Sequence, residues 1–117
     1  MSHVLIVAPD TDLRRSMQFA LEADGYVVSG RASIADVNVT PEEIDCVILD
    51  HHMADRRLAE ARIFCARFDP VVLLANTASH PLVVSVFRTL LKPQLGPTLS
   101  SAVSDALCAQ SGSTASP

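Results

Sequence analysis

The sequence predicts an α/β fold, a doubly wound parallel sheet with helices on both faces. The apolar runs 3–8, 46–49 and 71–75 have the length of buried strands, and they lack the polar alternation of a strand with one face in water. Stretches with apolar residues at helical spacing separate these runs, and this alternation gives parallel strands joined by crossovers. The chain has 117 residues, 49% of them hydrophobic, which suits a single domain.

The first half of the chain contains three predicted strands and one long helix. Asp10 or Thr11 is expected to cap the helix, and Gly25 to end it. The elements in order are strand 3–8, the helix after its cap, strand 26–30, a helix of one or two turns at 32–37, a loop over 38–43 with at most one helical turn at 40–43, and strand 46–49.

The second half predicts two more strands and two helices. Pro81 interrupts the stretch before the fifth strand, so only a turn or a short helix is expected there. The elements in order are helix 54–67, strand 71–75, the interrupted stretch, a strand within 87–91, and a last helix from 97 with Leu99, Ala102, Val103, Ala106 and Leu107 on one face. One domain over 1–110 and a flexible tail over 111–117 are the expected organisation.

Composition excludes several classes of function. The net charge of -4, the pI near 5.4 and the absence of a basic cluster argue against nucleic-acid binding. No apolar run approaches the roughly 20 residues of a membrane span, so a cytoplasmic protein without a membrane role is expected. No serine or cysteine stands near a plausible base, so we expect no enzyme.

Two charged residues at predicted strand ends are the candidate site. Asp50 follows the third strand, and Lys92, the only lysine of the chain, follows the fifth. Ligands of open α/β sheets bind beyond the carboxyl ends of the strands, so we expect Asp50 and Lys92 within ion-pair reach. The simpler alternatives are that Asp50 only caps a turn and that Lys92 is a surface lysine before a turn proline.

Over residues 3–110 the chain resembles the receiver domain of bacterial response regulators. The likeness is carried by Val4-Leu5-Ile6-Val7 followed by Asp10-x-Asp12-Leu13-Arg14-Arg15, by Asp45-x-Val47-Ile48-Leu49-Asp50-x-x-Met53, by Pro70 with the apolar run after it, and by Leu91-Lys92-Pro93. The resemblance implies five parallel strands in the flavodoxin-like order 2-1-3-4-5. It also implies that Asp50 is the phospho-acceptor, that Lys92 contacts the phosphate, and that the bond before Pro93 is cis.

The metal site of that family is altered in this sequence. Receivers carry two adjacent acids after the first strand, and Ala8 and Pro9 stand at those positions. Asp50 remains as a metal ligand, with Asp10 as a weak and doubtful substitute one residue further on. We therefore expect that Mg²⁺ is possible as a cofactor but binds weakly.

The signalling switch of the family is altered as well. Ala75 stands where receivers have threonine or serine, unless a register shift brings Thr77 there, and Thr89 stands at the aromatic switch position. The short stretch between Ala75 and Lys92 predicts a shortened or missing fourth helix. These departures indicate a divergent receiver or pseudo-receiver.

A metal site on the adjacent His51 and His52, with Asp50, Asp55 and His80, is an alternative that the spacing does not favour. In the simpler interpretation one of the two histidines faces the crevice and the other faces solvent.

Two functions remain open. The first is a stand-alone receiver in a phosphorelay, phosphorylated at Asp50. The second is a phosphorylation-independent pseudo-receiver that binds a protein or a ligand. Expected partners are a histidine kinase, a phosphotransfer protein or another signalling protein, bound through the last helix around 99–107 or the segment before the fifth strand. The chain itself is expected to be a monomer or weak homodimer.

Overall fold

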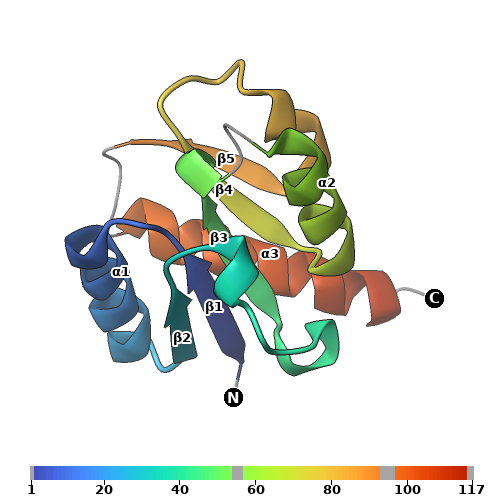
Figure 1. Cartoon of the computed structure of the whole chain (residues 1–117). Helices are drawn as coiled ribbons and strands as arrows, with labels where there is room; N and C mark the ends of the chain where they lie inside the picture. Colours follow the sequence, from blue (N-terminus) through green and yellow to red (C-terminus); the bar gives the residue numbers. More distant parts are fainter. Residues whose placement is uncertain (1, 54–56, 93–96, 116–117) are drawn as a thin grey trace.

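Five parallel strands form one sheet in the order β2-β1-β3-β4-β5 (Figure 1). The chain is described by a computed structural model over residues 2–53, 57–92 and 97–115. The strands are β1 (His3–Val7), β2 (Val27–Arg31), β3 (Cys46–Asp50), β4 (Val71–Ala75) and β5 (Arg88–Leu91). This order confirms the predicted flavodoxin-like sheet and puts β3 at its centre, between β1 and β4.

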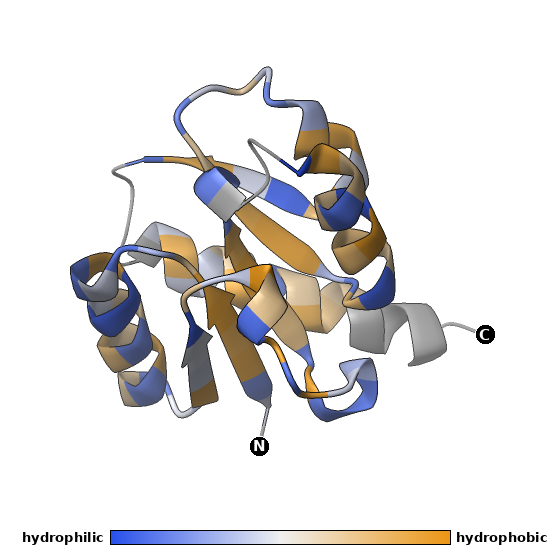
Figure 2. Ribbon diagram, viewed as in Figure 1, coloured by the Kyte–Doolittle hydropathy of each residue, from blue (hydrophilic) through white to orange (hydrophobic). Residues whose placement is uncertain are grey.

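Helices cover both faces of the sheet, as predicted. The helices α1 (Thr11–Ala23) and α3 (Pro97–Ala115) pack on one face, where Met17, Leu21 and Val103 are buried against strand side chains. On the other face lies α2 (Leu58–Arg67), with Phe64 buried. The central strands are apolar along their length (Figure 2) because both of their faces are covered.

The start and end of α1 follow from single residues. Asp10 is the cap, since its carboxylate accepts hydrogen bonds from two backbone N–H groups of the first turn. Gly25 lies just after the helix at a φ of 97°, a conformation that side chains with a Cβ rarely adopt. The structure thus selects Asp10 over Thr11 as the cap.

Short 3₁₀ helices, instead of α-helices, connect β2 to β3 and β4 to β5. Between β2 and β3 the chain forms η1 (Ile34–Asp36) and η2 (Pro41–Glu43), as the weak patterns predicted. Between β4 and β5 it forms only η4 (Pro81–Ser85), which confirms the predicted loss of the fourth helix. Leu82 of η4 is fully buried, and it seals part of the face that α2 covers.

Two predicted boundaries differ from the structure. The helix predicted over 54–67 begins at Leu58, and residues 54–56 lie outside the described residues. The last helix continues to Ala115, past the residue 111 at which the tail was expected to start. No proline interrupts the sequence between Pro97 and residue 117, and small residues can extend a helix. Even Gly112 makes the helix only about 1 kcal/mol less stable than alanine would.

The apolar face of α3 lies inside the core. Leu99, Ala102, Val103 and Ala106 are at most 1% exposed. Of the last helix, one of the two partner surfaces expected from the sequence, the apolar face is therefore part of the core. Among the described residues, no helix is both long and apolar enough to cross a membrane.

Candidate functional site

Asp50 is the last residue of the central strand and is almost fully buried. Its register partner on β4 is Leu74, and its side chain is 1% exposed. A buried carboxylate is stable only when it is paired or hydrogen-bonded. The groups that contact its two oxygen atoms therefore define the site.

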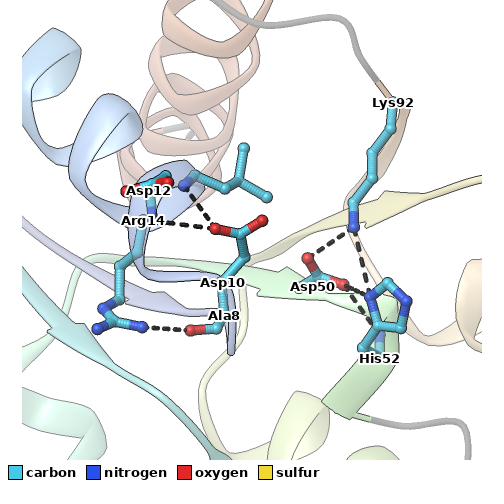
Figure 3. A network of polar contacts seen from close by, with 8 residues as sticks. Ala8, Asp10, Asp12, Arg14, Asp50, His52 and Lys92 are labelled. Carbon is cyan, nitrogen blue, oxygen red and sulfur yellow. Dashed lines mark hydrogen bonds and ion pairs between the residues drawn. The ribbon is translucent and has the colours of Figure 1, made fainter.

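Lys92 provides the charge that pairs with Asp50. Its backbone N–H donates to Ala75 O at the end of β4, at 2.9 Å, which holds the residue next to β4, one strand away from β3. Its ammonium then lies 2.7 Å from Asp50 Oδ2 (Figure 3). This confirms that the two residues share one site. The cis bond expected before Pro93 lies outside the described residues.

His52 occupies the other oxygen of Asp50. Both its backbone N–H and its Nδ1 lie 2.9 Å from Oδ1, while its side chain remains 53% exposed. The neighbouring His51 is buried, and its ring contacts that of His52 at a tilt of 32°, with the centroids 4.1 Å apart. The expectation that one histidine faces the crevice and the other faces solvent is therefore wrong in detail, because the partly exposed ring is the one that contacts Asp50.

The backbone part of the Asp50–His52 contact agrees with the simpler alternative from the sequence, in which Asp50 caps a turn, whereas the contact with the imidazole was not predicted. An aspartate at a turn commonly accepts a hydrogen bond from the backbone N–H two residues further on. Here that turn starts η3 (His51–Met53) and brings the imidazole of the second residue onto the same carboxylate.

The charge state of Asp50 follows from these contacts. Burial alone raises the pKa of the carboxyl group, because it penalises the charged form. The hydrogen bond from Lys92, the backbone N–H of His52 and the charge of Lys92 more than offset this, and the pKa falls below its ordinary value of 3.8. Asp50 is ionised at neutral pH.

The residues present do not fit the divalent metal that receivers hold. Mg²⁺ takes oxygen ligands, chiefly carboxylates. The side chains of Ala8 and Pro9 offer none, and the carbonyl oxygen of Ala8 accepts a hydrogen bond of 2.7 Å from Arg14 Nη1. The backbone oxygen of Ala8 is thus already paired with a guanidinium.

Asp10 is directed away from this position. Its Oδ1 accepts from the backbone N–H groups of Asp12 and Leu13 at 2.9 and 3.1 Å, and Figure 3 shows it at the helix start rather than at Asp50. Of the carboxylates such a site would use, only that of Asp50 lies at the centre.

The two switch positions carry no switch side chain. Ala75 ends β4 opposite Leu91, so no register shift replaces it, and the hydroxyl of Thr77 bonds Ser79 in an exposed turn. The hydroxyl of Thr89 is buried, and no described residue forms a hydrogen bond with it. A hydroxyl that closes over a phosphate is therefore missing from this part of the structure.

The histidine metal site gains only limited geometric support. Single ligand atoms of Asp50, His51 and His52 lie within 4.8 Å of one another, and the ring of His80 is 5.7 Å from that of His51. However, the rings of His51 and His52 are in contact with each other at a tilt of 32°, and the ammonium of Lys92 lies 3.5 Å from His52 Nδ1, where it would repel a metal cation. Asp55 lies outside the described residues.

Solved structures with this fold define the class of protein. A response regulator from Thermotoga maritima is 20% identical with a TM-score of 0.70, over 92% of this chain and 98% of that one. The receiver domain of HemR from Leptospira biflexa is 19% identical with a TM-score of 0.76, over 92% and 94%. A receiver-modulated diguanylate cyclase from Pelobacter carbinolicus reaches 0.76 at 20% identity, over 97% and 98%. The fold is that of a response regulator receiver domain.

A relative at higher identity identifies the family. No family model matches the chain. The transcriptional regulator protein FixT of Rhizobium meliloti (strain 1021) is 31% identical over 97 residues, which cover 82% of this chain and 84% of FixT. The chain belongs to the response regulator receiver family, together with FixT. This membership places it in two-component signal transduction, where receiver domains generally act as signalling modules rather than as enzymes.

Proposed function

We propose that this chain is a pseudo-receiver that binds a protein of a two-component pathway without metal-dependent phosphorylation of Asp50. The observation that carries the proposal is the set of contacts around Asp50. Lys92 and His52 already occupy both carboxylate oxygens, and no second carboxylate faces the centre among the described residues. A metal that offsets the charge of an incoming phosphoryl group has no site there.

The expected partners are histidine kinases, phosphotransfer proteins or other signalling proteins. Since the apolar face of α3 is in the core, the other expected surface, the segment before the fifth strand, supports the binding role. Val84 of η4 is 88% exposed, and Phe87 and Leu91 are each 38% exposed. These side chains lie in η4 or next to and within the edge strand β5, and an exposed apolar surface of this kind can bind a protein.

One observation favours a second candidate, an ordinary phospho-acceptor. The pair of Asp50 and Lys92 is retained with a contact of 2.7 Å, and a lysine in this place can pair with a phosphate. The two candidates differ in whether Mg²⁺ promotes phosphorylation of Asp50.

The test measures phosphate on Asp50 with acetyl phosphate as the donor, with and without Mg²⁺. A phosphate mass added to the intact chain and removed by hydroxylamine identifies the acyl phosphate. We expect no stimulation by Mg²⁺ in the parent, and stimulation in Ala8→Asp/Pro9→Asp, which restores the acid pair. Strong stimulation in the parent would favour the phospho-acceptor instead. Binding of purified histidine kinases to the parent and to Asp50→Asn should agree within about twofold, a difference of less than 0.5 kcal/mol.

A further inference from the structure

The imidazole of His52 is held in one orientation. Its Nδ1 and its backbone N–H both contact Asp50 Oδ1 at 2.9 Å, and the ring of His51 packs against its ring at a tilt of 32°, with the centroids 4.1 Å apart. These three contacts fix the ring plane and turn the Nε2 edge away from Asp50 (Figure 3).

The same contacts determine the tautomer. Asp50 is ionised, with Lys92 on Oδ2 at 2.7 Å, so its Oδ1 can only accept a hydrogen bond. The hydrogen bond between His52 and Asp50 therefore requires a proton on Nδ1, and in the neutral ring this tautomer leaves the lone pair on Nε2. No described residue forms a hydrogen bond with Nε2, and the side chain is 53% exposed.

We propose that Nε2 of His52 accepts a phosphoryl group from a nitrogen-linked phosphoryl donor, without a metal ion. The arrangement is that of an imidazole nucleophile oriented by a carboxylate. When Nε2 bonds to phosphorus the ring becomes positive, and the Asp50 carboxylate on Nδ1–H stabilises that charge. The inference goes beyond the proposed function, because partner binding does not require it.

The transfer is balanced in atoms and charge. The lone pair of Nε2 forms a new P–N bond, and the donor P–N bond breaks with its electron pair on the donor nitrogen. From the zwitterion of phosphoramidate that nitrogen leaves as ammonia. The Nδ1 proton stays between the ring and Asp50, and nothing is oxidised or reduced.

Accessibility favours His52 over Asp50 as the acceptor. The side chain of His52 is 53% exposed, so a phosphoryl donor can reach its ring. Asp50 is 1% exposed with both oxygens in use, and the metal ligands of the family are missing. The loss of the two metal-binding acids and the exposure of the His52 imidazole are therefore both consistent with a phosphoryl acceptor that needs no metal.

The experiment incubates the full chain with phosphoramidate and a chelator, and follows intact mass over time. Phosphohistidine is lost in acid and survives base, whereas an acyl phosphate is lost in base and in hydroxylamine. The variants are His52→Gln, Asp50→Asn and, as a matched imidazole control, His3→Gln, because His3 bonds Ser29 on β2, away from the site. Thermal unfolding of each variant checks folding.

We expect one acid-labile, base-stable phosphate in the parent and in His3→Gln, and none in His52→Gln. Asp50→Asn should keep the same phosphate but gain it roughly tenfold more slowly, since its amide accepts from Nδ1–H without offsetting charge. A phosphate sensitive to hydroxylamine and lost in Asp50→Asn would overturn the proposal. So would an unmodified parent, or a phosphate that His52→Gln retains. None of these results bears on kinase binding, which tests the proposed function separately.

Discussion

The ammonium of Lys92 lies 2.7 Å from Asp50 Oδ2, although the two residues are 42 positions apart in the chain. Lys92 is 20% exposed and Asp50 1% exposed, so the pair is partly shielded from water. In such a setting the loss of one partner leaves the other charge poorly compensated.

The first prediction concerns the pKa of Asp50. In Lys92→Met burial remains while the lysine hydrogen bond is lost, so the pKa of Asp50 should rise from its lowered value in the parent. Carbon-detected NMR titration of the Asp50 carboxyl measures this directly. An unchanged pKa would mean that His52 alone holds the carboxylate.

The same pair predicts a pH dependence of stability. Because the folded pKa of Asp50 is below 3.8, the pair should contribute fully above about pH 4 and be lost as the pH falls through the folded pKa. Lys92→Met should cost about 3 kcal/mol in unfolding free energy at pH 7, and less at pH 3. The control Arg57→Met breaks the exposed pair with Glu60 and should change stability by less than about 0.5 kcal/mol.

The second prediction is that Mg²⁺ binds weakly. Calorimetric titration of the parent should show no binding at physiological magnesium, because Asp10 is engaged at the start of α1. If binding is nevertheless tight and Asp10→Asn abolishes it, Asp10 has taken over as a ligand. Asparagine also caps helices, so that variant keeps the fold.

The third prediction concerns how the domain responds to a phosphoryl mimic. Ala75 has no hydroxyl, Thr89 replaces the aromatic residue, and η4 is short, so beryllofluoride should not shift the domain to a second state. Amide NMR over residues 76–109 measures the response. Large, saturable shifts that disappear in Asp50→Ala would restore the ordinary switch.

The fourth prediction concerns η4 as part of the core. Leu82→Ala should lower the unfolding free energy by about 2–5 kcal/mol, because a fully buried side chain is removed. Val84→Ala, in the same short helix but 88% exposed, should change it by less than about 0.5 kcal/mol. Equal effects in denaturant unfolding would mean that η4 is packed differently.

The fifth prediction concerns the buried hydroxyl of Thr89. It has no hydrogen-bond partner among the described residues, so Thr89→Val should be neutral or stabilise by up to about 1 kcal/mol. Thr77→Val removes a hydroxyl that bonds Ser79 and should destabilise slightly. Loss of stability in Thr89→Val would point to a polar contact that forms in solution.

The sequence by itself determined the fold, because strands buried on both faces must be apolar throughout. The runs ending at Val7, Asp50 and Ala75 therefore stand out, and the alternation with helices leaves few topologies. The crossovers expected from the sequence place the ends of the third and fifth strands at the same edge of the sheet, so the proximity of Asp50 and Lys92 is predictable from the sequence. The sequence also shows that Ala8 and Pro9 stand at the two positions where receivers have metal-binding acids.

The tertiary structure alone decided how the site is arranged. The placement of His52 on Asp50 depends on the dihedral angles of one turn after β3, which residue types do not specify. The burial of the α3 face was also undecided, since an apolar stripe such as Leu99 and Val103 serves equally for a core or for a partner. Sequence patterns fix which elements form, but contacts between side chains depend on how those elements pack.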